Sequence, residues 1–202
     1  MHTLTTPAPT DVRVSDTLTV TAWRTPIDHI GHDHRSPYAE RFVLPIIGPT
    51  CLWLLRCLAY GFDTFPDTLT VSRGSLGRQL GLNRDNAGIG RHSPLNRAFD
   101  RLTHFGYATQ PAPDVLNVRV ACPWLDAGQV ARLPDAHRAE HGAWIDAFNT
   151  ANPDDAELRD HAAHVATMRR RGATPELIDA ALHAWHATTA VIDALTRDPY
   201  AR

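Results

Sequence analysis

Apolar positions along this chain follow two periods, and the change of period separates short strands from helices. Apolar and polar residues alternate in DTLTVTAW (16–23) and in DTLTV (67–71), a pattern that predicts strands. Between them, the apolar run of GPTCLWLLRCLAYGF (48–62) predicts a largely buried helix that begins near Pro49 and ends at Gly61. The first third of the chain therefore predicts a strand, a buried helix and a second strand.

Two short amphipathic helices follow in the middle of the chain. RGSLGRQLGL predicts a helix at 74–80 that Gly81 ends, and SPLNRAFDRLTHFG predicts a second helix between a Ser93 cap and Gly106. The segments YATQ and VLNVRVA, separated by PAPD, then predict two strands joined by a turn.

The C-terminal part of the chain predicts three helices. The first ends near Asn152, the second covers 154–171, and the third covers 174–196 with Thr174 as its cap. The third helix has an apolar stripe, which favours either a homodimer through these helices or a core within the chain. The pattern alone leaves both alternatives open.

The order of elements over about residues 45–122 resembles the winged helix-turn-helix domain of MarR-like and GntR-like bacterial regulators. The resemblance rests on SLGRQLGL, SPLNRAFDRLTHFGYA and the strand pair around PAPD; LPIIGPTCLWLLR and SPLNRAFDRLTHFG also resemble proteins of GC-rich bacteria, which implies no activity. We therefore expect a mainly α fold with a small β component. Residues 1–40 would form an N-terminal extension, mobile in part and with one strand, 41–122 the winged helix-turn-helix domain, and 123–202 a C-terminal three-helix region.

Charge is distributed unevenly along the chain. The net charge is −2, and all 20 basic residues are arginine. Residues 1–40 carry a net charge of −2, 41–122 a net charge of +4 and 123–202 a net charge of −4. A basic middle between acidic ends favours an anionic partner for the middle, although a solvated basic face has the same pattern.

The helix that follows Ser93 divides into two faces. At 100° per residue, one face is apolar, and it consists of Leu95, Ala98, Phe99, Leu102 and Phe105. The opposite face is polar, and it consists of Arg97, Asp100 and His104, with Asn96, Arg101 and Thr103 at its flanks. A recognition helix needs this division, because one side packs while Arg and Asn on the other side meet base edges.

We expect Arg97 and Asn96 to read bases and Arg101 to contact phosphate or Asp100. The full set of residues predicted to contact double-stranded DNA is Arg84, Arg91, Ser93, Asn96, Arg97, Arg101 and His104.

The connection NRDNAGIGRH is longer than the turn that the resemblance implies. One alternative is that this connection is a loop without a function. The other is that Gly88 and Gly90 let backbone N–H groups approach a phosphate beside Arg84 and Arg91. The PAPD turn has no arginine, and only Arg119 lies nearby, so a minor-groove contact by this hairpin is not expected.

Twelve histidines raise the question of a metal site. The best candidates are His29, His32 and His34 in DHIGHDH, but no HExxH pattern or cysteine pair accompanies them, so neither a metal nor a cofactor is expected. The three cysteines fit no zinc motif, and we expect Cys51 and Cys57 to be small buried residues.

No catalytic motif is visible, so an enzyme is not expected. The chain has no apolar stretch of membrane length and no secretory signal pattern, so a cytoplasmic location is expected. The predicted function is sequence-specific binding of double-stranded DNA, as in a transcriptional regulator. The alternatives are a protein-interaction module on a winged-helix scaffold and a metal- or pH-responsive sensor.

Overall fold

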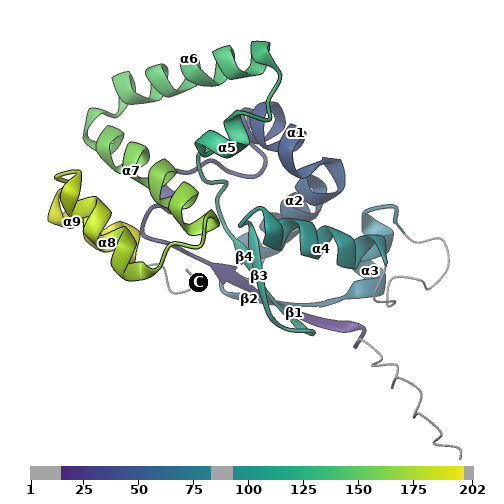
Figure 1. Cartoon of the computed structure of the whole chain (residues 1–202). Coiled ribbons are helices and arrows are strands. Elements are labelled where there is room, and N and C mark those ends of the chain that lie inside the picture. The colour runs from purple at the N-terminus through teal and green to yellow at the C-terminus, as the bar shows by residue number, and fades with distance from the viewer. Residues whose placement is uncertain (1–14, 83–92, 198–202) are drawn as a thin grey trace, which may run out of the picture.

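A four-stranded mixed sheet organises the protein. The computed structural model describes residues 15–82 and 93–197, which form this sheet and a larger number of helices (Figure 1). The strand order is β2–β1–β4–β3, and the strands are β1 (Thr17–Trp23), β2 (Thr68–Ser72), β3 (Ala108–Ala112) and β4 (Val115–Arg119). β1 pairs antiparallel with β2 and parallel with β4, while β3 and β4 form an antiparallel hairpin. The predicted mainly α fold with a small β component is confirmed.

β1 is an inner strand, although the sequence places it in an N-terminal extension. Its Val20 lies between Leu69 of β2 and Leu116 of β4, and Leu18 and Val20 are fully buried. The sheet therefore joins a segment of the predicted extension to the strands of the predicted domain at 41–122.

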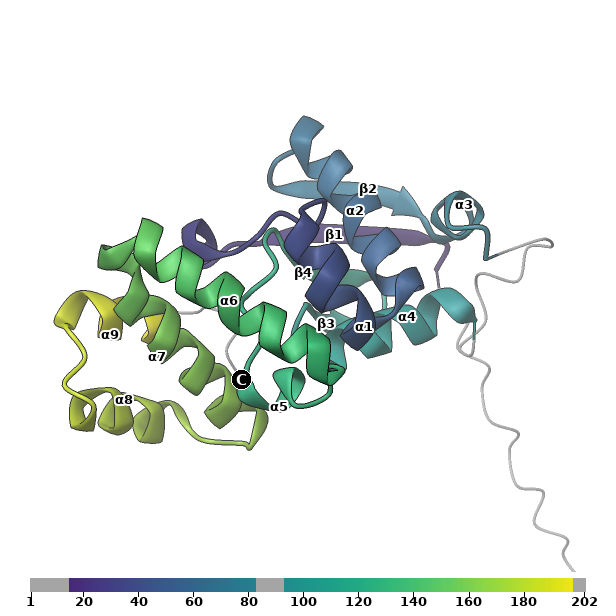
Figure 2. The ribbon, with the colours of Figure 1, turned by 90° about the horizontal axis from the view of Figure 1, so that it is seen from above.

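The helices lie mostly on one side of this sheet and at one end of it. In the described residues they are α1 (Leu44–Ile47), α2 (Pro49–Thr64), α3 (Arg73–Gln79), α4 (Pro94–His104), α5 (Ala127–Val130), α6 (Asp135–Ala151), α7 (Pro153–Arg170), α8 (Pro175–Ala184) and α9 (Thr189–Thr196). A 3-10 turn (Asp28–Ile30) and a π-helical turn (Ala39–Val43) precede them. α3 and α4 lie at one end of the molecule, and α7 to α9 lie at the other (Figures 1 and 2). Over the described residues, no helix combines the length and the apolar character that crossing a bilayer requires.

The main core lies between the sheet and the helices α2 and α4. The sheet contributes Leu18, Val20, Leu116 and Val118, and these alternate with residues that face the other side. The side chains of α2 and α4 that close this core are Leu54, Leu55, Leu58, Leu95, Phe99 and Leu102. Burial of each such side chain contributes about 1.5–3 kcal/mol.

α2 differs from the sequence prediction in two ways. The sequence predicts a largely buried helix, but Trp53 is 57% exposed and Tyr60 is 61% exposed. Gly61 does not end the helix, which continues to Thr64. A Cβ atom at Gly61 would lie 2.6 Å from Cδ1 of Leu69, so glycine here lets β2 pack directly on the helix backbone.

The predicted boundaries of the two central helices are confirmed by their caps. The Ser93 hydroxyl accepts a hydrogen bond from the backbone N–H of Asn96 at 3.1 Å. Gly81 and Gly106 follow α3 and α4 with φ of +68° and +76°, a conformation that favours glycine.

The C-terminal part forms five helices within residues 123–197 rather than the predicted three. The short α5 precedes α6, and the predicted helix at 174–196 divides into α8 and α9. His186 between them has a φ of +58°, and the Thr188 hydroxyl caps α9. Ile178 and Leu182 of the apolar stripe are buried and pack within the chain, whereas Trp185 of the same stripe is 39% exposed. The homodimer through these helices stays a prediction.

A buried arginine joins α3, α4 and the hairpin. Arg73 is fully buried, and its Nη1 donates to Oδ1 of Asn96 at 2.8 Å, while Nη2 donates to the carbonyl of Pro113 in the β3–β4 turn. Its guanidinium lies 5.4 Å from the centroid of the Phe99 ring. Burial lowers the pKa of Arg73 because the charged form loses its hydration. The Arg73 guanidinium thus links three segments that lie far apart in the sequence.

A cluster of aromatic and histidine rings joins α6 to the segment that follows β1. The Tyr38 hydroxyl donates to Nε2 of His141 at 3.0 Å and accepts from the backbone N–H of Leu125 at 3.0 Å. The His32 ring stacks on Tyr38 at 3.7 Å and meets Trp124 edge-on. Burial lowers the pKa of His32 to about 4 and also lowers that of His141. Both histidines are therefore neutral in the folded protein at neutral pH.

Replacement of Arg73 by Ala should lower the free energy of unfolding by about 2–4 kcal/mol. The variant leaves a cavity and removes the donors to Asn96 and Pro113. Arg78→Ala on the exposed side of the same helix is the matched control, and it should change stability by no more than about 0.5 kcal/mol. Urea denaturation measures both values, and equal effects of the two substitutions would show that burial of Arg73 has no special role.

Stability should fall as the pH drops from about 6.5 towards 4. An unfolded histidine gains a proton near pH 6.5, whereas folded His32 gains one only near pH 4, so acid favours the unfolded state in this window. His32→Phe retains a ring on Tyr38 but cannot titrate, and it should flatten the slope by up to about 1.4 kcal/mol per pH unit. Thermal melts from pH 7.5 to 4.5 test this, and an unchanged slope in the variant would contradict it.

Candidate functional site

α4 presents the division into two faces that the sequence predicts. Leu95, Ala98, Phe99 and Leu102 are buried, while the opposite face is exposed and carries Arg97, Asp100, Thr103 and His104. The helix starts at the Ser93 cap and lies at the same end of the molecule as α3 (Figures 1 and 2). The packing of its apolar face fixes the direction in which the polar face points.

Arg97 lies at the centre of the exposed face. Among the described residues, its guanidinium makes no hydrogen bond and no ion pair, and its side chain is exposed. An arginine in this position offers a planar set of donors to an external anion or base edge. The neighbouring Asp100 carries the opposite charge on the same face, which limits how strongly this face attracts an anion.

Asn96 and Arg101 have partners within the protein. Oδ1 of Asn96 accepts from Arg73, as described above. Nε and Nη2 of Arg101 donate to the carbonyls of Ile47 and Ile46, each at 2.7 Å. These carbonyls end α1 and lack partners within that helix, so Arg101 satisfies them. In this conformation both side chains hold α4 in place.

The remaining predicted residues differ in what the structure shows of them. Ser93 is buried and acts as the α4 cap. His104 is exposed, with its ring edge-on to Phe105 at 4.9 Å. Arg84 and Arg91 lie outside the described residues, as does the connection at 83–92, so its proposed anion contact stays a prediction.

Two further exposed arginines belong to neighbouring segments, and the sequence analysis did not select them. Arg78 is on α3, at the same end of the molecule. Arg132 follows α5, and its guanidinium lies 5.5 Å from the Phe105 ring at the end of α4. Arg132 belongs to the acidic C-terminal part of the sequence, so no local charge pattern marks it as a neighbour of α4.

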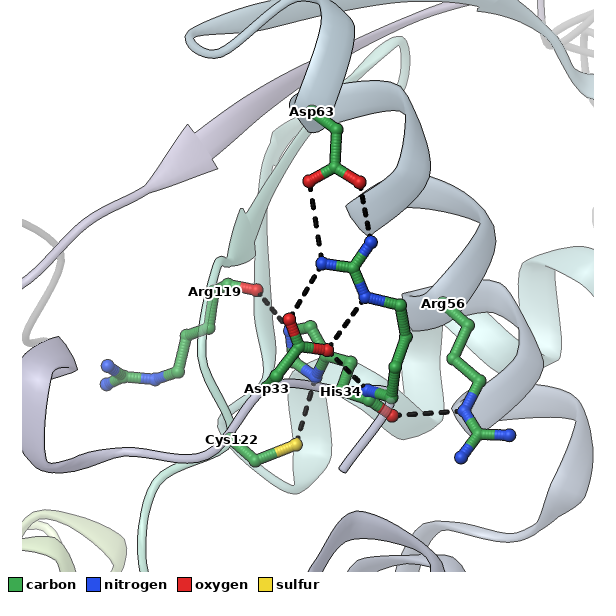
Figure 3. A network of polar contacts seen from close by, with 7 residues as sticks. Asp33, His34, Arg56, Asp63, Arg119 and Cys122 are labelled. Carbon is green, nitrogen blue, oxygen red and sulfur yellow. Dashed lines mark hydrogen bonds and ion pairs between the residues drawn. The ribbon is translucent and has the colours of Figure 1, made fainter. Parts of the chain in front are cut away.

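The histidines of DHIGHDH are not directed at a common point. His34 is buried; its Nε2 donates to the carbonyl of Arg119 at 2.7 Å, and its Nδ1 accepts from the Cys122 thiol at 2.9 Å (Figure 3). Burial raises the pKa of this thiol, which is therefore protonated and able to donate. His29 donates through Nδ1 to the carbonyl of Pro26.

The charged residues around this segment form an ion-pair network. Arg35 bridges Asp33 and Asp63, and Arg56 donates to the carbonyl of His34 at 3.0 Å (Figure 3). His32 stacks on Tyr38, away from this network. Within residues 15–82 and 93–197, no group of three His, Cys, Asp or Glu side chains is arranged to hold a metal ion.

The cysteines are placed much as the sequence predicts. Cys51 and Cys122 are buried, and Cys57 is partly buried. Burial raises the pKa of Cys51 to about 11, so its thiol stays protonated and unreactive at neutral pH. The described cysteines therefore contribute packing rather than a nucleophile.

α4 combines an exposed cation, Arg97, with a well-packed apolar face. No protein-family model matches the chain, and no curated protein and no solved structure is significantly similar to it. Its function is therefore inferred from its own residues and their geometry.

Proposed function

We propose that the protein binds double-stranded DNA through α4, in a winged helix-turn-helix arrangement of α2, β2, α3, α4 and the β3–β4 hairpin. The observation that carries this proposal is the position of Arg97, exposed at the centre of the polar face of a helix whose other face is buried. A helix of this kind can enter the major groove, where arginine recognises guanine through two hydrogen bonds.

The other arginines have distinct roles in this proposal. Arg78 and Arg132 contact phosphates, which supply affinity and salt dependence but no sequence information. Asn96 and Arg101 position α4, because their polar atoms are used by Arg73 and by the end of α1. The turn between β3 and β4 carries Asp114 and no arginine, so the hairpin stays outside the minor groove.

One feature departs from the arrangement that the sequence resemblance implies. β1 separates β2 from the β3–β4 hairpin, so the sheet has four strands instead of three. The extra strand lies in the middle of the sheet, and the order of α3, α4 and the hairpin along the chain is unchanged. DNA recognition of this kind supports a role as a transcriptional regulator in the cytoplasm.

A protein-interaction module is the second candidate function, and the exposed aromatic residues of α2 favour it. Trp53 and Tyr60 are more than half exposed, and so is Phe65 just after the helix. Exposed aromatic side chains are frequent anchors of protein–protein interfaces. These residues have no role in the DNA-binding proposal.

Arg97→Ala and Arg78→Ala should weaken DNA binding in different ways. On a site selected from a genomic library, loss of Arg97 should cost about 1–3 kcal/mol, and much less on random DNA. Loss of Arg78 should weaken both duplexes equally and lower the salt slope by about one unit. Fluorescence anisotropy titrations at several salt concentrations measure both effects.

Arg171→Ala is the matched control for these substitutions, because this arginine is exposed and follows α7 rather than belonging to α3 or α4. Its binding should equal that of the original chain. The proposal fails if Arg97→Ala keeps both its fold and its affinity. If the original chain binds no duplex even at low salt, the interaction-module function gains support.

A further inference from the structure

α2 has a second face, on the side opposite to its buried one, and this face is exposed. Steps of three or four residues return to the same side of a helix, so the face consists of Pro49, Trp53, Cys57, Tyr60 and Thr64. Four of these residues are exposed, and Cys57 is partly buried. This spacing is typical of a helix that packs against a second helix.

The two aromatic rings of this face are oriented by arginines. The guanidinium of Arg56 lies 5.7 Å from the centroid of the Trp53 ring, and that of Arg35 lies 4.9 Å from the centroid of the Tyr60 ring. More than half of each aromatic residue nevertheless stays exposed. A side chain that is already oriented loses less conformational entropy when it is buried in an interface.

The charges beside this face are paired within the chain. Arg35 forms ion pairs with Asp33 and Asp63 (Figure 3), and Arg56 forms one with Glu40. These two arginines and three carboxylates have a formal charge of −1, so they form no basic patch of the kind that nucleic acid requires. Because the face presents both signs of charge, it is electrostatically compatible with a copy of itself.

The aromatic residues are also placed for two-fold symmetry. Under a two-fold axis, residue i of one copy contacts residue j of the other, and j contacts i. Trp53 and Tyr60 are about two helical turns apart, and the midpoint between them falls between Arg56 and Cys57. Two antiparallel copies of α2 that cross at this midpoint place Trp53 of each copy on Tyr60 of the other.

The same register extends along the whole helix. It brings Thr64 of one copy level with Pro49 of the other, and Phe65, which is 62% exposed, follows directly after Thr64. An aromatic side chain buries about 200 Å² in full, so the exposed parts of four rings contribute on the order of 450 Å². A standard interface buries roughly 1,600 Å², so the flanking residues have to supply the remainder and a dimer of moderate affinity is expected.

We propose that two copies of this chain form a homodimer through the exposed faces of their α2 helices, packed antiparallel about a two-fold axis. The proposal rests on the second candidate function, a protein-interaction module, and names its partner. It does not depend on DNA binding, because the exposed face of α2 shares no residue with the polar face of α4.

The first experiment measures the oligomeric state of the full chain by sedimentation equilibrium over a range of micromolar concentrations. The original chain should associate to a dimer. Trp53→Ala and Tyr60→Ala should each weaken the dimer about tenfold or more, because each substitution removes a ring at two places in a symmetric interface. Both residues are exposed in the single chain, so the circular dichroism and the urea midpoint of the variants should be unchanged.

Leu177→Ala is the matched control, because Leu177 lies on α8 and is 58% exposed. This variant should associate as the original chain does. If Leu177→Ala or Trp185→Ala dissociates the dimer and Trp53→Ala does not, the C-terminal helices form the interface and the proposal is wrong.

A second experiment tests the antiparallel register. Trp53→Glu and Tyr60→Lys should each be monomeric alone, because either dimer would set a charge against an aromatic ring twice. An equimolar mixture of the two variants should associate more tightly than either variant alone. In the mixed dimer, Glu at 53 faces Lys at 60 on one side of the axis, and Trp53 faces Tyr60 on the other. A parallel pairing would set 53 against 53 and could not restore association, so a mixture that stays monomeric overturns the register.

The outcomes separate this proposal from the functions on which it does and does not rest. An original chain that stays monomeric at every concentration overturns the homodimer and leaves the α2 face to a different protein. A dimer that Trp53→Ala and Tyr60→Ala leave intact overturns both the α2 interface and the argument from exposed aromatic residues for an interaction module. DNA affinity is measured separately, and its absence would leave the homodimer standing.

Discussion

The pairing of β1 between β2 and β4 is the constraint on which the rest of the structure depends. The backbone N–H of Thr19 donates to the carbonyl of Asp114 at 2.8 Å, and that of Ala22 donates to Asp67 at 2.9 Å, so β1 is held on both sides. A register slip by one residue would turn Leu18 and Val20 out of the core. This register also aligns Trp23 with Arg119. One strand thus supplies part of the core that supports α4 and places Trp23 beside Arg119.

Four arginines near α4 have the same side chain but different roles, because their surroundings differ. Arg73 and Arg101 donate to carbonyl and amide oxygens at the two edges of α4, and Arg119 holds the residue that follows its C-terminal end. A buried guanidinium costs hydration free energy, which hydrogen bonds to otherwise unpaired backbone oxygens offset. Arg97 has no such partner among the described residues, and its exposed position on the rigid helix supports the proposal that it contacts DNA.

The sequence by itself determined the local elements: strands at β1, β2 and the hairpin, the caps of α3 and α4, and the two faces of α4. These follow from side-chain period and from residues such as Ser93, Gly81 and Gly106, whose effect depends on neighbours a few positions away. The sequence did not reveal the exposure of Trp53 or the break at His186. Secondary-structure propensity and hydrophobicity describe a segment by itself. They do not show which other segments will pack against it.

Only the tertiary structure decided which strands pair, which arginines are buried and where the histidines point. Arg73 became a buried bridge because Asn96 and Pro113, distant in the sequence, converge on it. His29, His32 and His34 lie close together in the sequence but bind different partners, since each is oriented by a different distant segment. Pairing, burial of charge and cavities are set by contacts between segments far apart along the chain, and local sequence patterns carry no information about those contacts.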